Sequence, residues 1–537
     1  MPANDLPALS RSTTIVLDTE APLRLADVHA IAASGAPLVL GPALRARAAA
    51  AEACLDRHVA ARRRIYGVTT GYGPLATSYI APERAAELQR YLVCHLATGV
   101  GAPLPPDQAR AVAVARLAAL AAGRSGVRAE VLDALLGALN AGLAPAIPEK
   151  GTVGASGDLT PLSHLALALM GEGAFLVDGA ERPAAEVLAA HGLAPIVLGR
   201  KDALALVNGT SAMTGIAALA GVRARWLLDT ALATTVTMAE LLGGRTEAWH
   251  KLIAAARPHP GQIHVQERLW ALAADSDRLV PPEQPPPVLD DLGEEGVAQS
   301  RPLPQDAYSL RCAPQLLGAI VDTLDWHERV VATELNAATD NPLVFAERDF
   351  VMHAGNFFGQ HVGFASDALT NAVVMLAVHS ERKVARLTDP VRSGGFPPFL
   401  QPRETGLMSG FMGAQVTASA LVGEMRARAH PASIQSISTN GDNQDINPMG
   451  TIAARKSAEL VEDAARVIAI EALAATQGFE LAGGFTSNGA GFSACARRLA
   501  ERVRALSDFV GADRPLAPDI ARVAAAARAG ELAQSLP

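Results

Sequence analysis

The spacing of apolar residues along the chain predicts long helices. In six segments the apolar residues recur every three or four positions, which places them on one face of a helix. These segments are residues 107–122, 211–242, 314–338, 359–386, 410–428 and 451–477. Because several of them exceed the usual length of a globular helix, they indicate a central bundle of long helices.

Segments with strand character are few and short. We expect strands at residues 14–16, 38–40 and 174–177. Residues 281–304 contain seven prolines, and proline cannot continue a helix because it lacks the backbone N–H. We therefore expect a solvated surface loop there. It leads directly into QDAYSLRC at residues 305–312, which makes that segment a candidate part of an active site.

The composition describes a long chain with little charge. Of its 537 residues, 50% are hydrophobic and 19% are charged, whereas about 25% are charged in an average protein. This low share suggests that much surface is buried, in one large core or between subunits. The formal net charge of −8 argues against binding of nucleic acid through a basic surface.

The chain has four cysteines: Cys54, Cys94, Cys312 and Cys495. No two of them form a C-x-x-C pair, so neither a zinc ribbon nor a dithiol motif is indicated, and a reducing compartment is favoured. His353 and His361 have no accompanying metal-ligand pattern, so no metal is expected. With no signal pattern and no apolar run of membrane-spanning length, we expect a soluble cytoplasmic protein.

The most informative segment is GTVGASGDLTPLSHLA at residues 151–166. If the backbone bends sharply, the amide nitrogen of Gly157 can attack the carbonyl carbon of Ala155, and glycine tolerates such a bend. Loss of water closes a five-membered imidazolone ring. Loss of the Ser156 hydroxyl as a second water leaves an exocyclic methylidene, which is an electrophile built from the chain itself.

The same tripeptide has a simpler interpretation as a turn before a helix. In that interpretation Asp158 or Thr160 is the N-cap and Pro161 lies in the first turn. The two interpretations are compatible, because a helix N-terminus behind the ring would stabilise developing negative charge.

The full segment closely resembles the motif of the histidine, phenylalanine and tyrosine ammonia-lyases. Further motifs agree in the same order along most of the chain, so chance agreement is negligible. They are YGVTTGYGPLA (66–76), LVCHLATGVG (92–101), DALALVNGTSAMTG (202–215), QDAYSLRCAPQ (305–315), ELNAATDNP (334–342), HAGNFFGQH (353–361), SGFMGAQVTA (409–418) and STNGDNQDINPMG (438–450).

The resemblance implies a prosthetic group, a fold and an assembly. The prosthetic group is 4-methylidene-imidazol-5-one (MIO), formed from Ala155, Ser156 and Gly157 without an external cofactor. The fold is mainly α, with an N-terminal MIO domain at residues 1–215 and a long-helix domain at residues 216–537. The family forms homotetramers whose active sites combine residues from three subunits.

The resemblance also assigns roles to individual residues. Tyr66 is the base that removes the β-proton of the substrate; a free phenol has a pKa near 10 and needs local help to ionise. Tyr308 orients the electrophile or the intermediate. Arg311 anchors the substrate carboxylate, which a guanidinium fork can grip with two hydrogen bonds.

Three more residues are assigned to the same site. Asn208 and Asn341 resemble the amides that hold the MIO oxygen and the substrate carboxylate. Phe357 resembles the aromatic residue beside the prosthetic group. Whether the substrate attacks the methylidene through its amine or through its ring stays open, although amine addition is favoured for a tyrosine-like substrate.

Two positions narrow the substrate. The pair His95-Leu96 resembles the tyrosine type, because His95 can hydrogen-bond a phenolic hydroxyl while Leu96 packs on the ring. A pocket built for a hydroxyl disfavours a substrate that lacks one. Gln444 stands where histidine-type enzymes carry a glutamate, and Asn440 and Asn443 in the same segment are candidate contacts to the substrate or the electrophile.

We therefore predict a lyase that converts L-tyrosine into trans-p-coumarate and ammonia, with possible action on L-phenylalanine or L-DOPA. Tyrosine 2,3-aminomutase is the main alternative, and histidine or phenylalanine ammonia-lyase and an inactive binding protein are others. Met408 and Pro448 depart from the family pattern, which has asparagine and serine there. GASGD is not the G-x-S-x-G elbow of a hydrolase.

Overall fold

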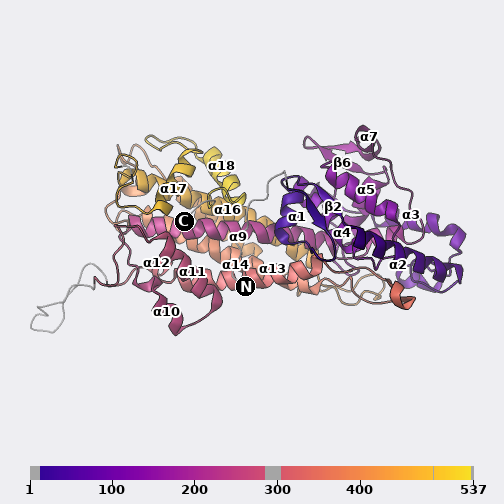
Figure 1. Ribbon diagram of the computed structural model, residues 1–537. Helices are drawn as coiled ribbons and strands as arrows, with labels where there is room; N and C mark the ends of the chain where they lie inside the picture. The colour runs from indigo at the N-terminus through magenta and orange to yellow at the C-terminus, as the bar shows by residue number, and fades with distance from the viewer. Residues whose placement is uncertain (1–12, 285–303, 488, 534–537) are drawn as a thin grey trace, which may run out of the picture. The chain divides into compact units, whose positions relative to one another are not determined.

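The computed structural model describes residues 13–284, 304–487 and 489–533, and it is mostly helical (Figure 1). The chain forms two compact units. Unit 1 contains residues 1–222, 326–368 and 431–458, and unit 2 contains residues 223–325, 369–430 and 459–537. The division at residue 215 stays a prediction. Unit 1 also contains the later segments 326–368 and 431–458. A single boundary in the sequence does not separate the two units.

Unit 1 begins with helices and very small sheets. The helices are α1 (Leu25–Ala32), α2 (Pro42–Ala60), α3 (Ala85–Leu96), α4 (Pro106–Ala121), α5 (Ala129–Asn140), α6 (Leu159–Leu169), α7 (Ala184–Ala190) and α8 (Asp202–Val207). The strands are β1 (Ile15–Leu17), β2 (Leu38–Leu40), β3 (Val100–Pro103), β4 (Ala144–Pro145), β5 (Pro148–Lys150), β6 (Ala174–Val177) and β7 (Ala180–Pro183). The three predicted strands are confirmed as β1, β2 and β6, apart from one residue at the ends of β1.

The strands form small sheets of two or three strands each. β1 pairs with β2 in parallel, β3 with β5 in antiparallel, and β4, β6 and β7 form one sheet in that order. A later hairpin of unit 1 joins β8 (Leu343–Phe345) to β9 (Phe350–Met352). Asn341 lies just before this hairpin and His353 just after it, so one hairpin positions both side chains.

The six predicted helices are all present, with ends that differ by a few residues. They are α4, α9 (Ser211–Leu241), α13 (Ala313–Leu335), α14 (Gln360–Leu387), α15 (Met412–Arg428) and α16 (Gly450–Leu481). Apolar spacing found them because each buries a continuous face. Thirteen residues of α4 are buried, among them Gln108 and Arg116, so this helix is enclosed on nearly every side.

Polar contacts join the long helices within each unit. In unit 1, the ring nitrogens of His327 on α13 lie 3.1 Å from the carbonyl oxygens of Ala217 on α9 and Ala365 on α14. In unit 2, Lys383 on α14 forms a fully buried ion pair with Glu471 on α16 at 2.6 Å. Buried charges need such pairing, because burial without a partner is strongly unfavourable.

Unit 2 also contains shorter helices and the start of the proline-rich segment. The helices are α10 (Lys251–Ala256), α11 (Pro260–Leu272), α12 (Tyr308–Arg311), α17 (Ala494–Arg504) and α18 (Ala517–Arg528). Of the predicted loop, residues 285–303 lie outside the described residues; residues 281–284 are non-helical.

One described helix, α14, is long and apolar enough to cross a membrane by length and composition. However, 67% of its apolar window is buried inside the structure, as in the core helix of a globular bundle.

Candidate active site

The tripeptide Ala155-Ser156-Gly157 forms a tight turn between β5 and α6. Gly157 has φ +75°, and its N–H donates to the carbonyl oxygen of Gly154 at 3.1 Å. A Cβ at this position would lie 2.2 Å from the carbonyl oxygen of Gly209. Only glycine fits this backbone, both for its conformation and for the close approach of the neighbouring chain.

The helix predicted after the tripeptide is confirmed. Asp158 occupies the N-cap position of α6, while Thr160 and Pro161 lie in its first turn. The Asp158 side chain does not cap α6. It accepts instead from the backbone N–H of Met213 at 2.8 Å and from the hydroxyl of Thr451. Burial raises the pKa of Asp158 to about 6, against the opposing effect of these donors.

Two amide side chains donate to Ser156. Asn208 Nδ2 lies 2.8 Å from the Ser156 carbonyl oxygen, and Gln444 Nε2 lies 3.1 Å from Ser156 Oγ. The Gln444 side-chain oxygen accepts from the hydroxyl of Thr439 at 2.8 Å, which fixes the direction of the amide. The serine is therefore held at its carbonyl and at its hydroxyl by residues far away in the sequence.

A buried arginine, Arg116 on α4, holds the backbone of Asn208 in place. Its Nη1 donates to the Asn208 carbonyl oxygen at 2.8 Å, and the residue is 0% exposed. Burial lowers the pKa of Arg116 to about 10, and the charges of Asp340 and Asp158 oppose this shift. The guanidinium thus stays charged at neutral pH and ties α4 to the segment that holds the tripeptide.

These contacts fit the prosthetic group that the resemblance implies. In the imidazolone ring, the carbonyl oxygen of Ser156 would be the ring oxygen, and Asn208 already donates to it. The Ser156 hydroxyl, which must leave, already accepts from Gln444. The bend at Gly157 and its missing Cβ satisfy the backbone requirement.

A cavity of about 910 Å³ lies beside the tripeptide, and its lining comes from unit 1. Ala155 and Ser156 open onto it. The other predicted site residues that line it are Tyr66, His95, Leu96, Asn208, Asn341, Phe357, Asn440, Asn443 and Gln444. Their positions in the sequence span almost 380 residues, so this proximity is a property of the fold.

Tyr66 presents its hydroxyl to this cavity from a glycine-rich turn. The backbone N–H of Gly73 donates to the Tyr66 hydroxyl oxygen at 2.8 Å. Gly73 has φ +51°, a conformation that favours glycine. The backbone N–H of Tyr66 donates to His353 Nε2 at 3.1 Å. A donor on the phenol oxygen stabilises negative charge there.

His95 lies at the end of α3 with its two ring nitrogens in different surroundings. Nδ1 lies 3.1 Å from the carbonyl oxygen of Tyr91. A carbonyl oxygen only accepts, so Nδ1 carries the proton. In the neutral ring Nε2 is then an acceptor. The lining next to His95 is apolar, with Leu92 and Leu96 from the same helix.

Asn341 is almost completely buried, and its side-chain oxygen is engaged. It accepts from the backbone N–H of Ala354 at 2.7 Å. This orients the amide and leaves its NH₂ group as a donor toward the cavity. An amide donor of this kind suits a carboxylate or a carbonyl oxygen.

Tyr308 and Arg311 belong to unit 2, where they are the first and last residues of the short helix α12. Tyr308 is 70% exposed, and the Arg311 guanidinium carbon lies 4.5 Å from the centre of its ring. Arg311 also lines a second pocket of about 380 Å³ in unit 2, together with Arg245, Asp306 and Gln315. Its buried Nε has no hydrogen-bond partner among the described residues.

The backbone of α12 is held by two buried side chains. His379 Nε2 donates to the Ser309 carbonyl oxygen at 2.8 Å, and Trp249 Nε1 donates to the Leu310 carbonyl oxygen at 3.1 Å. Burial and the nearby Lys383 hold the pKa of His379 well below its ordinary value. His379 is therefore a neutral donor at physiological pH.

The two departures from the family pattern lie in different units. The Pro448 ring lies 3.3 Å from the position that a Cβ on Gly154 would occupy, which places it directly beside the tripeptide. Met408 lies in a turn of unit 2, where its backbone pairs with Thr405.

Sequence reasoning missed several residues of this region. Tyr72 lines the cavity, and its ring meets that of Tyr66 edge to face. Gln89 donates to its hydroxyl at 2.9 Å, and burial raises its pKa. Tyr72 stands in the glycine-rich motif that pointed to Tyr66, so the motif itself carried the signal. Arg116 and His379 had no comparable local signal.

Comparisons with known proteins find similar lyases. A family model described as aromatic amino acid lyase matches residues 23–506. A tyrosine ammonia-lyase of Cereibacter sphaeroides is 49% identical over 505 residues, covering 93% of this chain and 95% of the relative. A histidine ammonia-lyase of Symbiobacterium thermophilum is 41% identical, with 95% and 96% covered.

Solved structures show the same fold. A tyrosine aminomutase from Streptomyces globisporus matches with a TM-score of 0.90 at 38% sequence identity. The match covers 97% of this chain and 98% of that one.

Proposed function

The chain belongs to the aromatic amino acid lyase family, and within it we propose that the protein eliminates ammonia from L-tyrosine to give trans-p-coumarate. The choice of tyrosine as the substrate rests on the hydrogen bonding of the His95 ring. Its Nδ1 is occupied by the Tyr91 carbonyl, which leaves Nε2 as an acceptor for a phenolic O–H on the cavity wall. Neither L-phenylalanine nor cinnamate-like products without a hydroxyl would use this acceptor.

The electrophile is MIO, formed from Ala155, Ser156 and Gly157. When formed, it supplies an electrophilic methylidene carbon that makes the substrate amine easier to expel. Asn208 supports it by donating to the Ser156 carbonyl oxygen at 2.8 Å. A fixed donor beside an oxygen that gains negative charge is the kind of preorganised dipole that lowers activation barriers. α6 begins directly after the tripeptide, and the positive end of its dipole also favours negative charge there.

Tyr66 removes the proton from the β-carbon of the substrate. The proton passes to the Tyr66 oxygen in its phenolate form, the C–H electron pair forms the Cα–Cβ double bond, and the Cα–N bond breaks to release ammonia. The Gly73 N–H at 2.8 Å stabilises negative charge on that oxygen before the transfer. The buried neighbour Tyr72 cannot replace Tyr66 as the base, because burial raises its pKa.

The substrate carboxylate is bound by Asn341 and Arg311. The Asn341 NH₂ group faces the cavity, since its oxygen is held by Ala354. Arg311 and Tyr308 reach the site from another copy of the chain in a homotetramer. Two observations support this: the lining of the cavity comes from unit 1 alone, and Tyr308 is largely exposed in the single chain.

The far end of the cavity selects the side chain. Leu96 packs on the aromatic ring while His95 accepts the phenol proton. Gln444 is uncharged and donates to Ser156, so position 444 itself offers no carboxylate to pair with a protonated imidazole. This favours tyrosine over histidine; Phe357, Asn440 and Asn443 complete the wall around the substrate.

A tyrosine 2,3-aminomutase is the second candidate. The likeness to the Streptomyces globisporus tyrosine aminomutase, with a TM-score of 0.90, favours it specifically. It would use the same residues for the elimination and then return ammonia to the β-carbon. The two outcomes differ in how long the closed site retains the unsaturated acid.

The test is product analysis with purified protein and L-tyrosine. The proposal expects trans-p-coumarate and ammonia in equal amounts, with no external cofactor added. A β-amino acid as the main product would replace the proposal with the aminomutase. We also propose that the protein acts in the cytoplasm, because its four cysteines are unpaired, as in a reducing compartment.

A further inference from the structure

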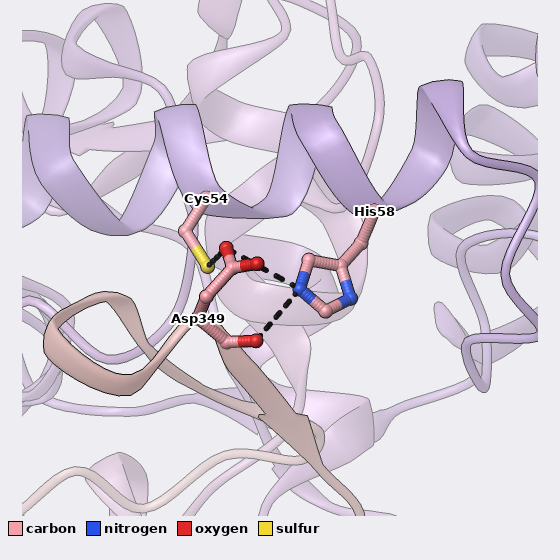
Figure 2. A group of neighbouring side chains, drawn as sticks. All are labelled: Cys54, His58 and Asp349. Carbon is pink, nitrogen blue, oxygen red and sulfur yellow. Dashed lines mark hydrogen bonds and ion pairs between the residues drawn. The ribbon is translucent and has the colours of Figure 1, made fainter.

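A second group of reactive side chains comes from α2 and from the turn of the β8–β9 hairpin (Figure 2). Cys54 and His58 are one helical turn apart on α2, so both project from the same face. Asp349 comes from the hairpin turn and reaches toward both. Cys54 Sγ lies 3.4 Å from Asp349 Oδ1, and His58 Nε2 lies 3.6 Å from the same oxygen.

These separations match those between ligands of a tetrahedral zinc ion. Zinc binds thiolate sulfur at about 2.3 Å, imidazole nitrogen at about 2.0 Å and carboxylate oxygen at about 2.0–2.2 Å. Two such ligands at the tetrahedral angle are roughly 3.3–3.6 Å apart. The three ligand atoms of this cluster all lie within 4.8 Å of one another, so small side-chain rotations suffice to surround one ion.

We propose that Cys54, His58 and Asp349 bind one Zn²⁺ ion. Sulfur, nitrogen and oxygen from three side chains make a donor set that zinc accepts, and solvent supplies the fourth ligand. The Asp349 side chain is 56% exposed, which gives the ion a path of entry and a water a place to bind. The site is separate from the cavity of the proposed lyase and does not depend on its chemistry.

In the hydrogen bonds of this cluster, Cys54 and His58 both act as donors to Asp349. The Cys54 thiol donates to Asp349 Oδ1, and His58 Nε2–H donates to the Asp349 backbone carbonyl at 3.0 Å. Zinc binding replaces the thiol proton, which is released to solvent, and moves the His58 proton to Nδ1.

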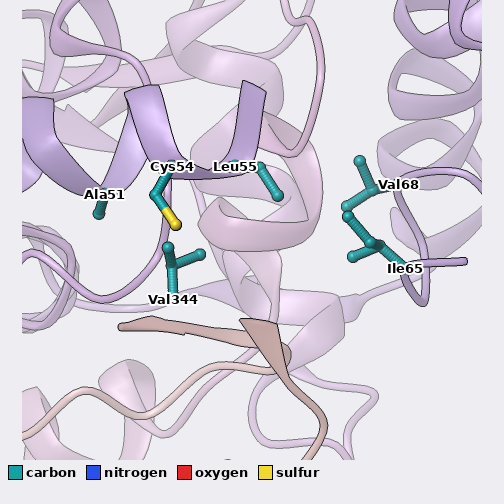
Figure 3. Packing of buried hydrophobic residues seen from close by; sticks show 6 residues of the cluster. All are labelled: Ala51, Cys54, Leu55, Ile65, Val68 and Val344. Carbon is teal, nitrogen blue, oxygen red and sulfur yellow. The ribbon is translucent and has the colours of Figure 1, made fainter. Parts of the chain in front are cut away.

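The surroundings of Cys54 favour a tightly held metal. Cys54 is 0% exposed and belongs to a buried apolar cluster with Ala51, Leu55, Ile65, Val68 and Val344 (Figure 3). Apolar packing fixes the position of the sulfur and excludes water from its side of the site. A low-dielectric environment also strengthens the attraction between thiolate and zinc.

Arg57 is the natural competitor for this site. Its Nη2 lies 2.8 Å from Asp349 Oδ1, and its side chain is 58% exposed. The guanidinium and the zinc ion therefore compete for one carboxylate oxygen. Removal of Arg57 should free the carboxylate and tighten metal binding, an outcome that a cluster with a purely structural role would not produce.

A zinc ion at this site would hold the β8–β9 hairpin in place. Asn341 and His353 lie at the two open ends of this hairpin, and His353 accepts from the Tyr66 backbone. A zinc ion at the turn ties the hairpin to α2 and reduces its motion. This departs from the expectation that the chain holds no metal; the missed signal was the Cys-x-x-x-His spacing on one helix.

The experiment uses untagged, full-length protein treated with a chelator and then dialysed against Zn²⁺ or Co²⁺. One equivalent of metal per chain is expected, and Co²⁺ should show a thiolate-to-metal charge-transfer band. Cys54→Ser should lose this band and bind zinc at least tenfold more weakly. Cys94→Ser is the matched control, because Cys94 is exposed and outside the cluster, and it should bind as the unchanged protein does.

Asp349→Asn provides a second test of metal binding in case Cys54→Ser folds poorly. The residue is exposed and has φ +54°, a conformation that asparagine tolerates. Asp349→Asn should weaken binding, while Arg57→Gln should strengthen it severalfold. Absence of bound metal in the unchanged protein, or equal affinity in Asp349→Asn and the unchanged protein, would overturn the proposal.

Discussion

Asn208 donates from Nδ2 to the carbonyl oxygen of Ser156 at 2.8 Å, across a gap of 52 residues in the sequence. The Asn208 backbone is fixed in turn by Arg116 at 2.8 Å. The donor therefore stands in place before any reaction begins. This relationship links the fold to the proposed chemistry, because the same oxygen would be the ring oxygen of the electrophile.

Asn208→Ala removes that donor. We expect kcat with L-tyrosine to fall about 100- to 1000-fold, as when one donor is removed from an oxyanion site. Intact mass should be measured on the same sample. A mass lower by two waters would show that the ring still forms and that the loss is catalytic. Unchanged kcat would remove Asn208 from the mechanism.

His95→Phe removes the acceptor for the phenol. We expect the ratio of kcat/KM for L-tyrosine over L-phenylalanine to fall about 100-fold, since an unpaired hydroxyl in an apolar pocket is disfavoured. Cys94→Ser is the matched control, because it neighbours His95 on α3 and is not part of the cavity lining. An unchanged ratio in His95→Phe would show that His95 does not contact the hydroxyl.

Mixed assemblies test whether Tyr66 and Arg311 come from different copies of the chain. Tyr66→Phe and Arg311→Gln should each be nearly inactive alone. Co-expression of the two variants should restore part of the activity, because some sites would combine an intact Tyr66 with an intact Arg311 from another subunit. If both residues served one site within a single chain, no mixed assembly would regain activity.

His379 is predicted to position α12 through its bond to the Ser309 carbonyl. His379→Phe leaves that buried oxygen without its donor, which should cost about 1–3 kcal/mol of unfolding free energy and lower kcat/KM. His379→Gln should largely restore both, because its amide can donate from a similar place. A fully active His379→Phe protein would contradict this role.

The same residue carries a pH dependence of known sign. Burial holds the folded-state pKa of His379 well below the ordinary value, so only the unfolded chain takes up the proton near pH 6.5. Its contribution to stability is therefore complete above about pH 6.5 and is lost as pH falls toward the folded-state pKa. The difference in unfolding free energy between the unchanged protein and His379→Gln should follow this course.

Regular and local features could be predicted from the sequence. The long helices were predicted because an amphipathic or buried helix repeats its apolar residues every three to four positions. The turn at Gly157 followed from glycine in a short motif. Of the two predicted N-caps, Asp158 is the one that the structure has, and Thr160 lies in the first turn. The Asp158 side chain accepts from Met213 instead of capping α6, because tertiary donors outcompete the local ones.

Long-range pairing could not be derived from spacing. The contact of Ser156 with Asn208 was expected only through the family resemblance, and its contact with Gln444 was not expected. Arg116 was missed because nothing near it in the sequence marks its partner 92 residues away. Tyr308 and Arg311 were grouped with the site by resemblance, while the structure describes them in unit 2.

The central claim is tested most directly by competition among L-tyrosine, L-phenylalanine, L-histidine and L-DOPA, with each product identified. The account predicts the highest kcat/KM for L-tyrosine, with trans-p-coumarate and ammonia released in equal amounts. A higher kcat/KM for L-histidine, or β-tyrosine as the main product from L-tyrosine, would contradict it.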